Sequence, residues 1–132
     1  MINTATKEKK KYFLTASHCG TIGSNHILVF NYESSTCERG GDRHLKHTVS
    51  GLKIIARNTF TDFMLLEIEE PIPREYNVYL AGWNAVDIPE QNMSVAIHHP
   101  AGDVKKISFS YLPLLHDRWS TEFFGSHWKV QR

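Results

Sequence analysis

The apolar residues of this chain fall into short runs that are separated by turn-forming residues. The runs cover residues 12–15, 27–32, 52–56, 63–68, 78–83, 95–98, 107–112 and 128–130. None of them keeps the 3.6-residue period of a helix for long, and most are rich in β-branched or aromatic residues. Several short strands in succession predict an all-β barrel or sandwich, with a helical turn only at residues 16–19.

The polar stretches and the composition agree with a folded domain. Residues 34–48 and 84–92 are polar and are expected to be surface connections between strands. The 132 residues suffice for one ordinary domain or two small cores. Apolar residues make up 41% and charged residues 22%, and no apolar run approaches the ~20 residues that span a bilayer. The net charge of +1 gives no case for nucleic acid as a partner.

One segment carries a specific chemical signal. At residues 14–19 an apolar strand runs into small residues and then presents His18 beside a cysteine, in the order Leu-Thr-Ala-Ser-His-Cys. A single histidine among eight proves little by itself. The surrounding segment, however, resembles the motif around the catalytic histidine of trypsin-like serine endopeptidases. This resemblance implies that His18 is the general base.

A histidine that acts as a base needs a carboxylate to fix its tautomer. The resemblance implies the chain order His, Asp, Ser, with about 45 residues between the first two. Asp62 lies 44 residues after His18, and the Phe-Met-Leu-Leu that follows it resembles the Asp-x-x-Leu-Leu pattern of these enzymes. We therefore expect Asp62 to orient His18.

The nucleophile is expected to be absent from this chain. Serine endopeptidases of this kind carry it in a Gly-x-Ser-Gly turn, roughly 80 to 95 residues after the aspartate. Ser120 and Ser126 lie too early and lack the following glycine. The chain by itself is therefore expected to form no acyl-enzyme and to show no peptidase activity.

Further segments resemble bacterial lysyl endopeptidases. They are residues 11–16, 31–32, 35–37, 62–67, 81–83, 97–100 and 105–108. The resemblance implies a secreted serine endopeptidase that cleaves polypeptides after lysine and needs no cofactor. It also implies a trypsin-like double β-barrel that is incomplete at both ends. Residues 1–76 would form most of the first barrel, and residues 77–132 would begin the second.

The same resemblance suggests roles for a few other side chains. Trp119 is a candidate for shielding the imidazole, and His98 and His99 are expected to be structural. In the family the cysteines comparable to Cys19 and Cys37 pair with partners that would precede Met1. We therefore expect these two cysteines not to be bonded to each other.

Two other functions are alternatives to an endopeptidase: a zinc site and a non-catalytic binding module. His44 and His47 form a His-x-x-His pair, but no second pair at a supporting spacing completes a zinc site, so no metal is expected. A non-catalytic pseudoprotease that binds a protein partner is the second alternative. Neither nucleic acid nor a membrane is expected as a partner. The complete endopeptidase of which this chain would be a part is expected to be a monomer.

Overall fold

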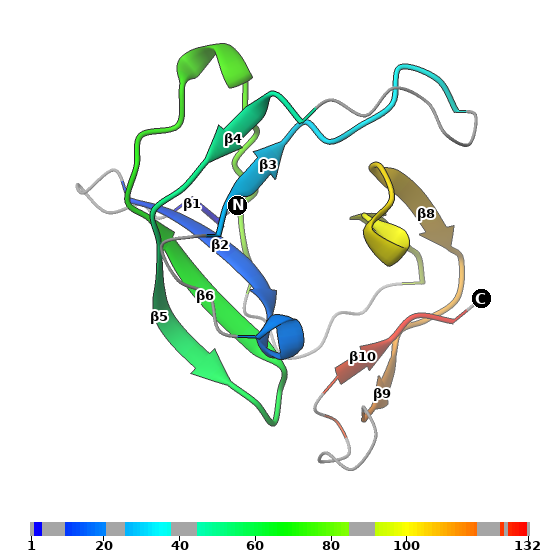
Figure 1. Ribbon diagram of the computed structural model, residues 1–132. Coiled ribbons are helices and arrows are strands. Elements are labelled where there is room, and N and C mark those ends of the chain that lie inside the picture. Colours follow the sequence, from blue (N-terminus) through cyan, green and yellow to red (C-terminus); the bar gives the residue numbers. More distant parts are fainter. Residues whose placement is uncertain are drawn as a thin grey trace. The chain divides into compact units, whose positions relative to one another are not determined.

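The computed structural model describes residues 2–3, 10–20, 26–37, 45–84, 92–118, 125 and 127–131. These residues form β-strands, all paired antiparallel, together with three short 3-10 turns and no α-helix (Figure 1). The strands are β1 (Ile2–Asn3), β2 (Lys11–Ala16), β3 (Leu28–Phe30), β4 (His47–Val49), β5 (Leu52–Asn58), β6 (Phe63–Ile68), β7 (Ser94–His98), β8 (Lys106–Ser110), β9 (Leu115–Asp117) and β10 (His127–Lys129). The turns are η1 (Ser17–Cys19), η2 (Arg74–Tyr76) and η3 (Pro100–Gly102). The predicted all-β class is confirmed.

The chain divides into two compact units. The first combines Met1–Asn31 with His44–Asn84, and the second combines Tyr32–Arg43 with Ala85–Arg132. The boundary expected between two barrels at residue 76 stays a prediction. Within the described ranges, no helix is long and apolar enough to cross a membrane.

The first unit is built on a four-stranded sheet in the order β1-β2-β6-β5 (Figure 1). β6 alternates between inner and outer positions, and its inner residues Met64 and Leu66 are fully buried. Val49 and Leu52 join them in the core, against which Phe13 also packs. This alternation follows directly from the Phe-Met-Leu-Leu-Glu-Ile sequence of the strand.

The pairing of β5 with β6 contains a β-bulge. Ile54 lies opposite Leu66, but the register then shifts, so that Arg57 rather than Ala56 lies opposite Met64. Residues that face each other across an antiparallel pair point to the same side of the sheet. The bulge therefore places Arg57 on the side of the sheet that carries the buried residues.

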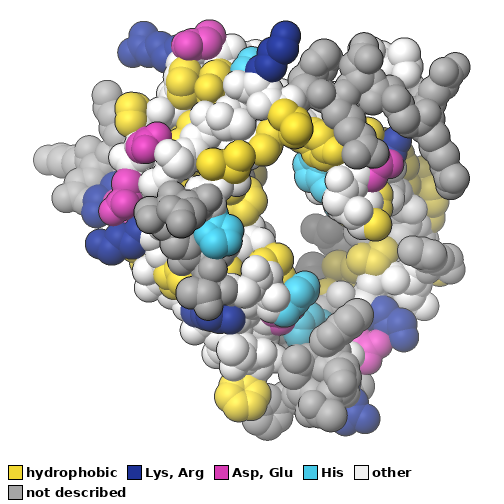
Figure 2. All heavy atoms as spheres, viewed as in Figure 1, with side chains coloured by type: hydrophobic (Ala, Val, Ile, Leu, Met, Phe, Trp, Pro, Cys, Tyr) yellow, Lys and Arg dark blue, Asp and Glu magenta, His cyan; other side chains and the backbone are white. Residues whose placement is uncertain are grey.

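The second unit contains two hairpins, β7 with β8 and β9 with β10. Its buried side chains include Val104 and Ser110. One face of the β7–β8 hairpin remains exposed and carries large apolar side chains, and Figure 2 shows apolar side chains at the molecular surface in several places. The exposed residues of this hairpin face are Val95, Ile97, Ile107 and Phe109.

The two neighbouring histidines of the second unit make local contacts. His98 Nε2 lies 2.8 Å from the Ser108 hydroxyl on the facing strand. His99 Nδ1 donates to the Asp103 carbonyl at 3.0 Å, and its ring stacks on Tyr32. That both histidines are structural stays a prediction.

Three segments differ from the sequence-based expectation. Residues 78–83 form no strand, although Ala81 makes a single bridge. Conversely, β4 begins within the stretch expected to be a loop, and β9 lies outside every predicted run. Both are three-residue strands whose polar and apolar side chains form no recognisable pattern, so pairing with β3 and β10 determines their conformation.

Candidate active site

The sheet brings His18 and Asp62 together at one end. β2 ends at Ala16, and η1 carries His18 immediately beyond it. β6 begins at Phe63, directly after Asp62, and Ala16 lies opposite Phe63 in the antiparallel pair. Two residues that are 44 positions apart in the sequence therefore emerge side by side.

Both oxygens of Asp62 accept hydrogen bonds from His18. Imidazole Nδ1 lies 2.6 Å from Oδ2, and the His18 backbone N–H donates to Oδ1 at 2.8 Å. An ionised carboxylate only accepts hydrogen bonds, so Nδ1 carries a proton, and in the neutral imidazole Nε2 keeps its lone pair. The imidazole is 75% exposed and the Asp62 side chain only 20% exposed. The pair thus presents a basic nitrogen to solvent while its carboxylate is sheltered.

These contacts keep Asp62 ionised at neutral pH. The hydrogen bond from the His18 ring, followed by that from the His18 backbone N–H, lowers the pKa of Asp62 below its ordinary value of 3.8. Because this pKa is lower in the folded than in the unfolded chain, the ionised carboxylate stabilises the fold above about pH 4. That contribution is lost as the pH falls through the lowered pKa.

The backbone around Asp62 is fixed by short-range hydrogen bonds. Asp62 itself has a positive φ of 51°, a conformation that aspartate tolerates better than most residues. Asn58 Oδ1 accepts from the backbone N–H groups of Phe60 (2.8 Å) and Thr61 (3.1 Å). The Ser17 N–H donates to the Asp62 carbonyl at 3.1 Å. The turn before β6 is therefore tied both to β5 and to η1.

Arg57 fixes the backbone next to His18 through two hydrogen bonds to Ser17. Its Nε donates to the Ser17 hydroxyl at 2.7 Å, and its Nη2 donates to the Ser17 carbonyl at 2.8 Å. Ser17 is 1% exposed and directly precedes His18. A planar guanidinium with two donors constrains orientation as well as position. Arg57 thus fixes the turn that presents the imidazole.

Neither Arg57 nor Asn58 was predicted from the sequence. Strand alternation counted from Leu52 and Ile54 would place Arg57 on the opposite side of the sheet, away from Ser17. The bulge after Ile54 reverses this placement. No residue pattern marks the bulge, so the sequence carried no signal for this contact.

Replacing Arg57 with Met is expected to lower the free energy of unfolding by about 1 to 2 kcal/mol. The methionine keeps an unbranched apolar stem but removes both donors from the buried Ser17. Denaturation in urea, followed by circular dichroism, measures the change, and Lys46→Met at an exposed position is the control. Equal midpoints for the two variants would show that the Arg57 contacts add nothing to stability.

Of the other candidate residues, the structure describes the two cysteines but not Trp119. Cys19 and Cys37 are both exposed free thiols, and Cys19 Sγ lies 3.8 Å from the Thr15 hydroxyl. That the two cysteines do not bond to each other in the oxidised protein stays a prediction. Trp119 lies outside the described residues, as do Ser120, Ser126 and His44. In the part of the chain that the structure describes, no three His, Cys, Asp or Glu side chains gather as metal ligands would.

The chain is similar to known proteins over most of its length. The family described as "Lysyl endopeptidase, C-terminal domain" matches residues 1–131. A lysyl endopeptidase of Pseudomonas aeruginosa strain PAO1 is 29% identical over 116 residues. The match covers 82% of this chain and 24% of the relative, so the chain spans about a quarter of that protein's length.

Proposed function

The chain belongs to the lysyl endopeptidase family, and we propose that it supplies the base and the orienting carboxylate of a serine endopeptidase that cleaves polypeptides after lysine. The observation that carries this proposal is the 2.6 Å contact between His18 Nδ1 and Asp62 Oδ2. It supports the proposal because it selects the tautomer of the neutral imidazole in which Nε2 has a free lone pair, as a general base requires.

The proposed reaction uses the two residues in succession. A serine hydroxyl attacks the peptide carbonyl, and His18 Nε2 takes the hydroxyl proton as the new C–O bond forms. His18 then gives this proton to the leaving amine when the C–N bond breaks. Asp62 stays ionised throughout and stabilises the imidazolium. Water subsequently hydrolyses the acyl-enzyme by the same proton transfers, which regenerates the serine.

The nucleophile is proposed to come from sequence outside these 132 residues. No serine of the chain lies in a Gly-x-Ser-Gly turn, and the backbone amides next to that serine would also supply the oxyanion hole. Trp119 is proposed to shield the imidazole. We further propose a secreted, monomeric parent enzyme whose partners are polypeptides rather than nucleic acid or membranes. Lysine preference is proposed from the family, because the pocket that would bind the lysine side chain has no assigned residue here.

Labelling by a fluorophosphonate probe tests the proposal. The purified 132-residue chain is expected to gain no probe mass. A polypeptide extended by its in-frame flanking sequence, if this encodes a Gly-x-Ser-Gly turn, is expected to gain one probe and to cleave a lysyl peptide faster than its arginyl analogue. Labelling of the 132-residue chain would contradict the assignment of the nucleophile. An extended, folded polypeptide that binds peptides without cleaving them would instead establish the non-catalytic alternative.

A further inference from the structure

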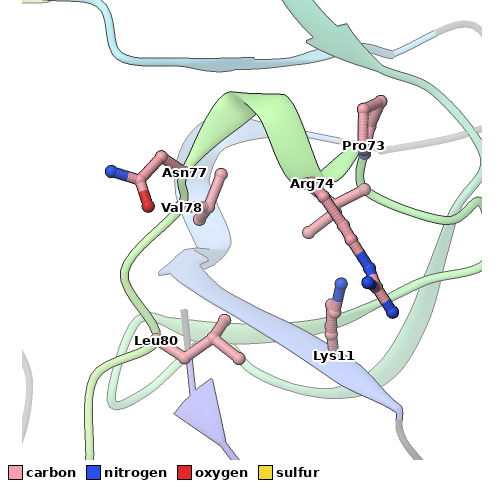
Figure 3. Close-up of a pocket in the computed structure, with 7 residues that line it drawn as sticks. Lys11, Pro73, Arg74, Asn77, Val78 and Leu80 are labelled. Carbon is pink, nitrogen blue, oxygen red and sulfur yellow. The ribbon is translucent and has the colours of Figure 1, made fainter.

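A pocket of about 200 Å³ lies in the first unit, between the start of β2 and the segment around η2. Figure 3 shows Lys11 reaching into it from β2 and Arg74 from η2, with the two cationic groups directed toward the same space. The Asn77 side chain points away from them. The pocket shares no residue with the His18–Asp62 pair.

The two cations of this pocket have no acidic partner among the described residues. Lys11 lies opposite Ile68, on the side of the sheet that faces the core, and it is half-buried. Its neighbour Lys10 is paired with Glu67, which shows that an acidic partner is available on the other side of the sheet. Arg74 is exposed, and two like charges directed toward one space repel each other, so a bound anion would relieve this repulsion.

The 3-10 turn η2, which carries Arg74, is anchored to other segments of the first unit through Tyr76. The Tyr76 carbonyl accepts from Asn31 Nδ2 at 2.7 Å, and the Tyr76 hydroxyl donates to the Thr48 carbonyl at 3.2 Å. The Tyr76 ring also stacks on His47, with 4.4 Å between the ring centroids. Because η2 is anchored in this way, the pocket is formed before any ligand arrives.

Apart from Asn77, the other residues that line the pocket are apolar. Ile72 is 8% exposed and belongs to the hydrophobic core, against which Val78 packs. In Figure 3 the side chains of Val78 and Leu80 border the same space as the two cations. An inorganic anion would use the charged side and leave this apolar wall wet, whereas an organic acid can cover both.

From the paired cations and the apolar wall, we propose that this pocket binds a carboxylate attached to an aliphatic body. The carboxylate accepts hydrogen bonds from Lys11 Nζ and the Arg74 guanidinium, and the aliphatic group packs on Val78 and Leu80. This binding is independent of the proposed peptidase function.

Titration of the ¹⁵N-labelled 132-residue chain with N-acetyl-L-leucine, followed by amide chemical shifts, tests the proposal. Saturable shifts are expected at Lys11, Ile72, Arg74 and Val78. Lys11→Gln and Arg74→Gln should each weaken binding by about fivefold or more, and Lys46→Gln should leave it unchanged. Asp62→Asn should also bind as the unmodified chain does, which separates this site from the proposed active site.

Two ligand controls separate the charged from the apolar contribution. N-acetyl-L-leucinamide lacks the negative charge and is expected not to saturate, and acetate lacks the aliphatic body and is expected to bind more weakly. Should either variant fail to fold, the unmodified chain still reports charge dependence, because 0.5 M NaCl should weaken binding by screening. The proposal is overturned by equal binding of the amide, by equal binding of acetate, or by an affinity that does not change with salt.

Discussion

Replacing Asp62 with Asn is expected to lower peptide-bond hydrolysis by about 10⁴-fold when residues 1–132 are joined to a nucleophilic serine. The amide keeps the shape of the side chain but has an NH₂ group in place of one carboxylate oxygen. To accept from the His18 backbone N–H, which donates to Oδ1 at 2.8 Å, the amide must turn its NH₂ toward the imidazole. Nδ1 then becomes an acceptor and Nε2 carries the proton, so the base is lost.

The rate constant for hydrolysis of a lysyl peptide at neutral pH measures this effect. Glu75→Gln is the matched control, because it also converts a carboxylate into an amide but lies exposed on η2, away from His18. The rate constant of this variant should equal that of the unsubstituted polypeptide. A loss of less than tenfold for Asp62→Asn, in a variant that folds normally, would remove Asp62 from the proposed mechanism.

Replacing Leu66 with Ala is expected to lower the free energy of unfolding by about 2 to 5 kcal/mol. Leu66 has no exposed surface and lies on β6 between Met64 and Ile68, so its truncation leaves a cavity at the centre of the core. Marginal stability of small domains makes a loss of this size large enough to unfold much of the chain.

Leu14→Ala provides the comparison for this core substitution. Leu14 is 53% exposed on the adjacent strand β2, so the same truncation there should change the free energy of unfolding by roughly 1 kcal/mol or less. Urea denaturation of both variants gives the difference. If the two leucines proved equally costly to truncate, β6 could not be the centre of the core.

The fold class and the central pair of the site could be predicted from the sequence because their signals are local. β6 was predicted with its observed bounds, since an apolar run between an aspartate and two glutamates has clear ends. His18 and Asp62 were brought together by motif and spacing, and the structure accounts for that spacing through the pairing of β2 with β6. Their catalytic roles stay a proposal.

What could not be predicted depends on contacts between distant segments. β4 and β9 are short strands whose residues have no alternating pattern, and only their partners give them strand geometry. Residues 78–83 are apolar and were predicted to be a strand, yet in this segment only Ala81 pairs. Arg57 was missed for the same reason, because its contact with Ser17 arises from the register of two strands.

The extra residue in β5 has a consequence for how such a site tolerates change over evolution. Deletion of Ile55, which is 44% exposed, would leave a regular strand in which Ala56 still lies opposite Leu65 and Arg57 still lies opposite Met64. Ser17 would then keep both of its hydrogen bonds from Arg57. The orientation of His18 therefore depends on the register of Arg57 against β6 rather than on the number of residues in β5, so the loss of one residue from this strand is expected to be tolerated.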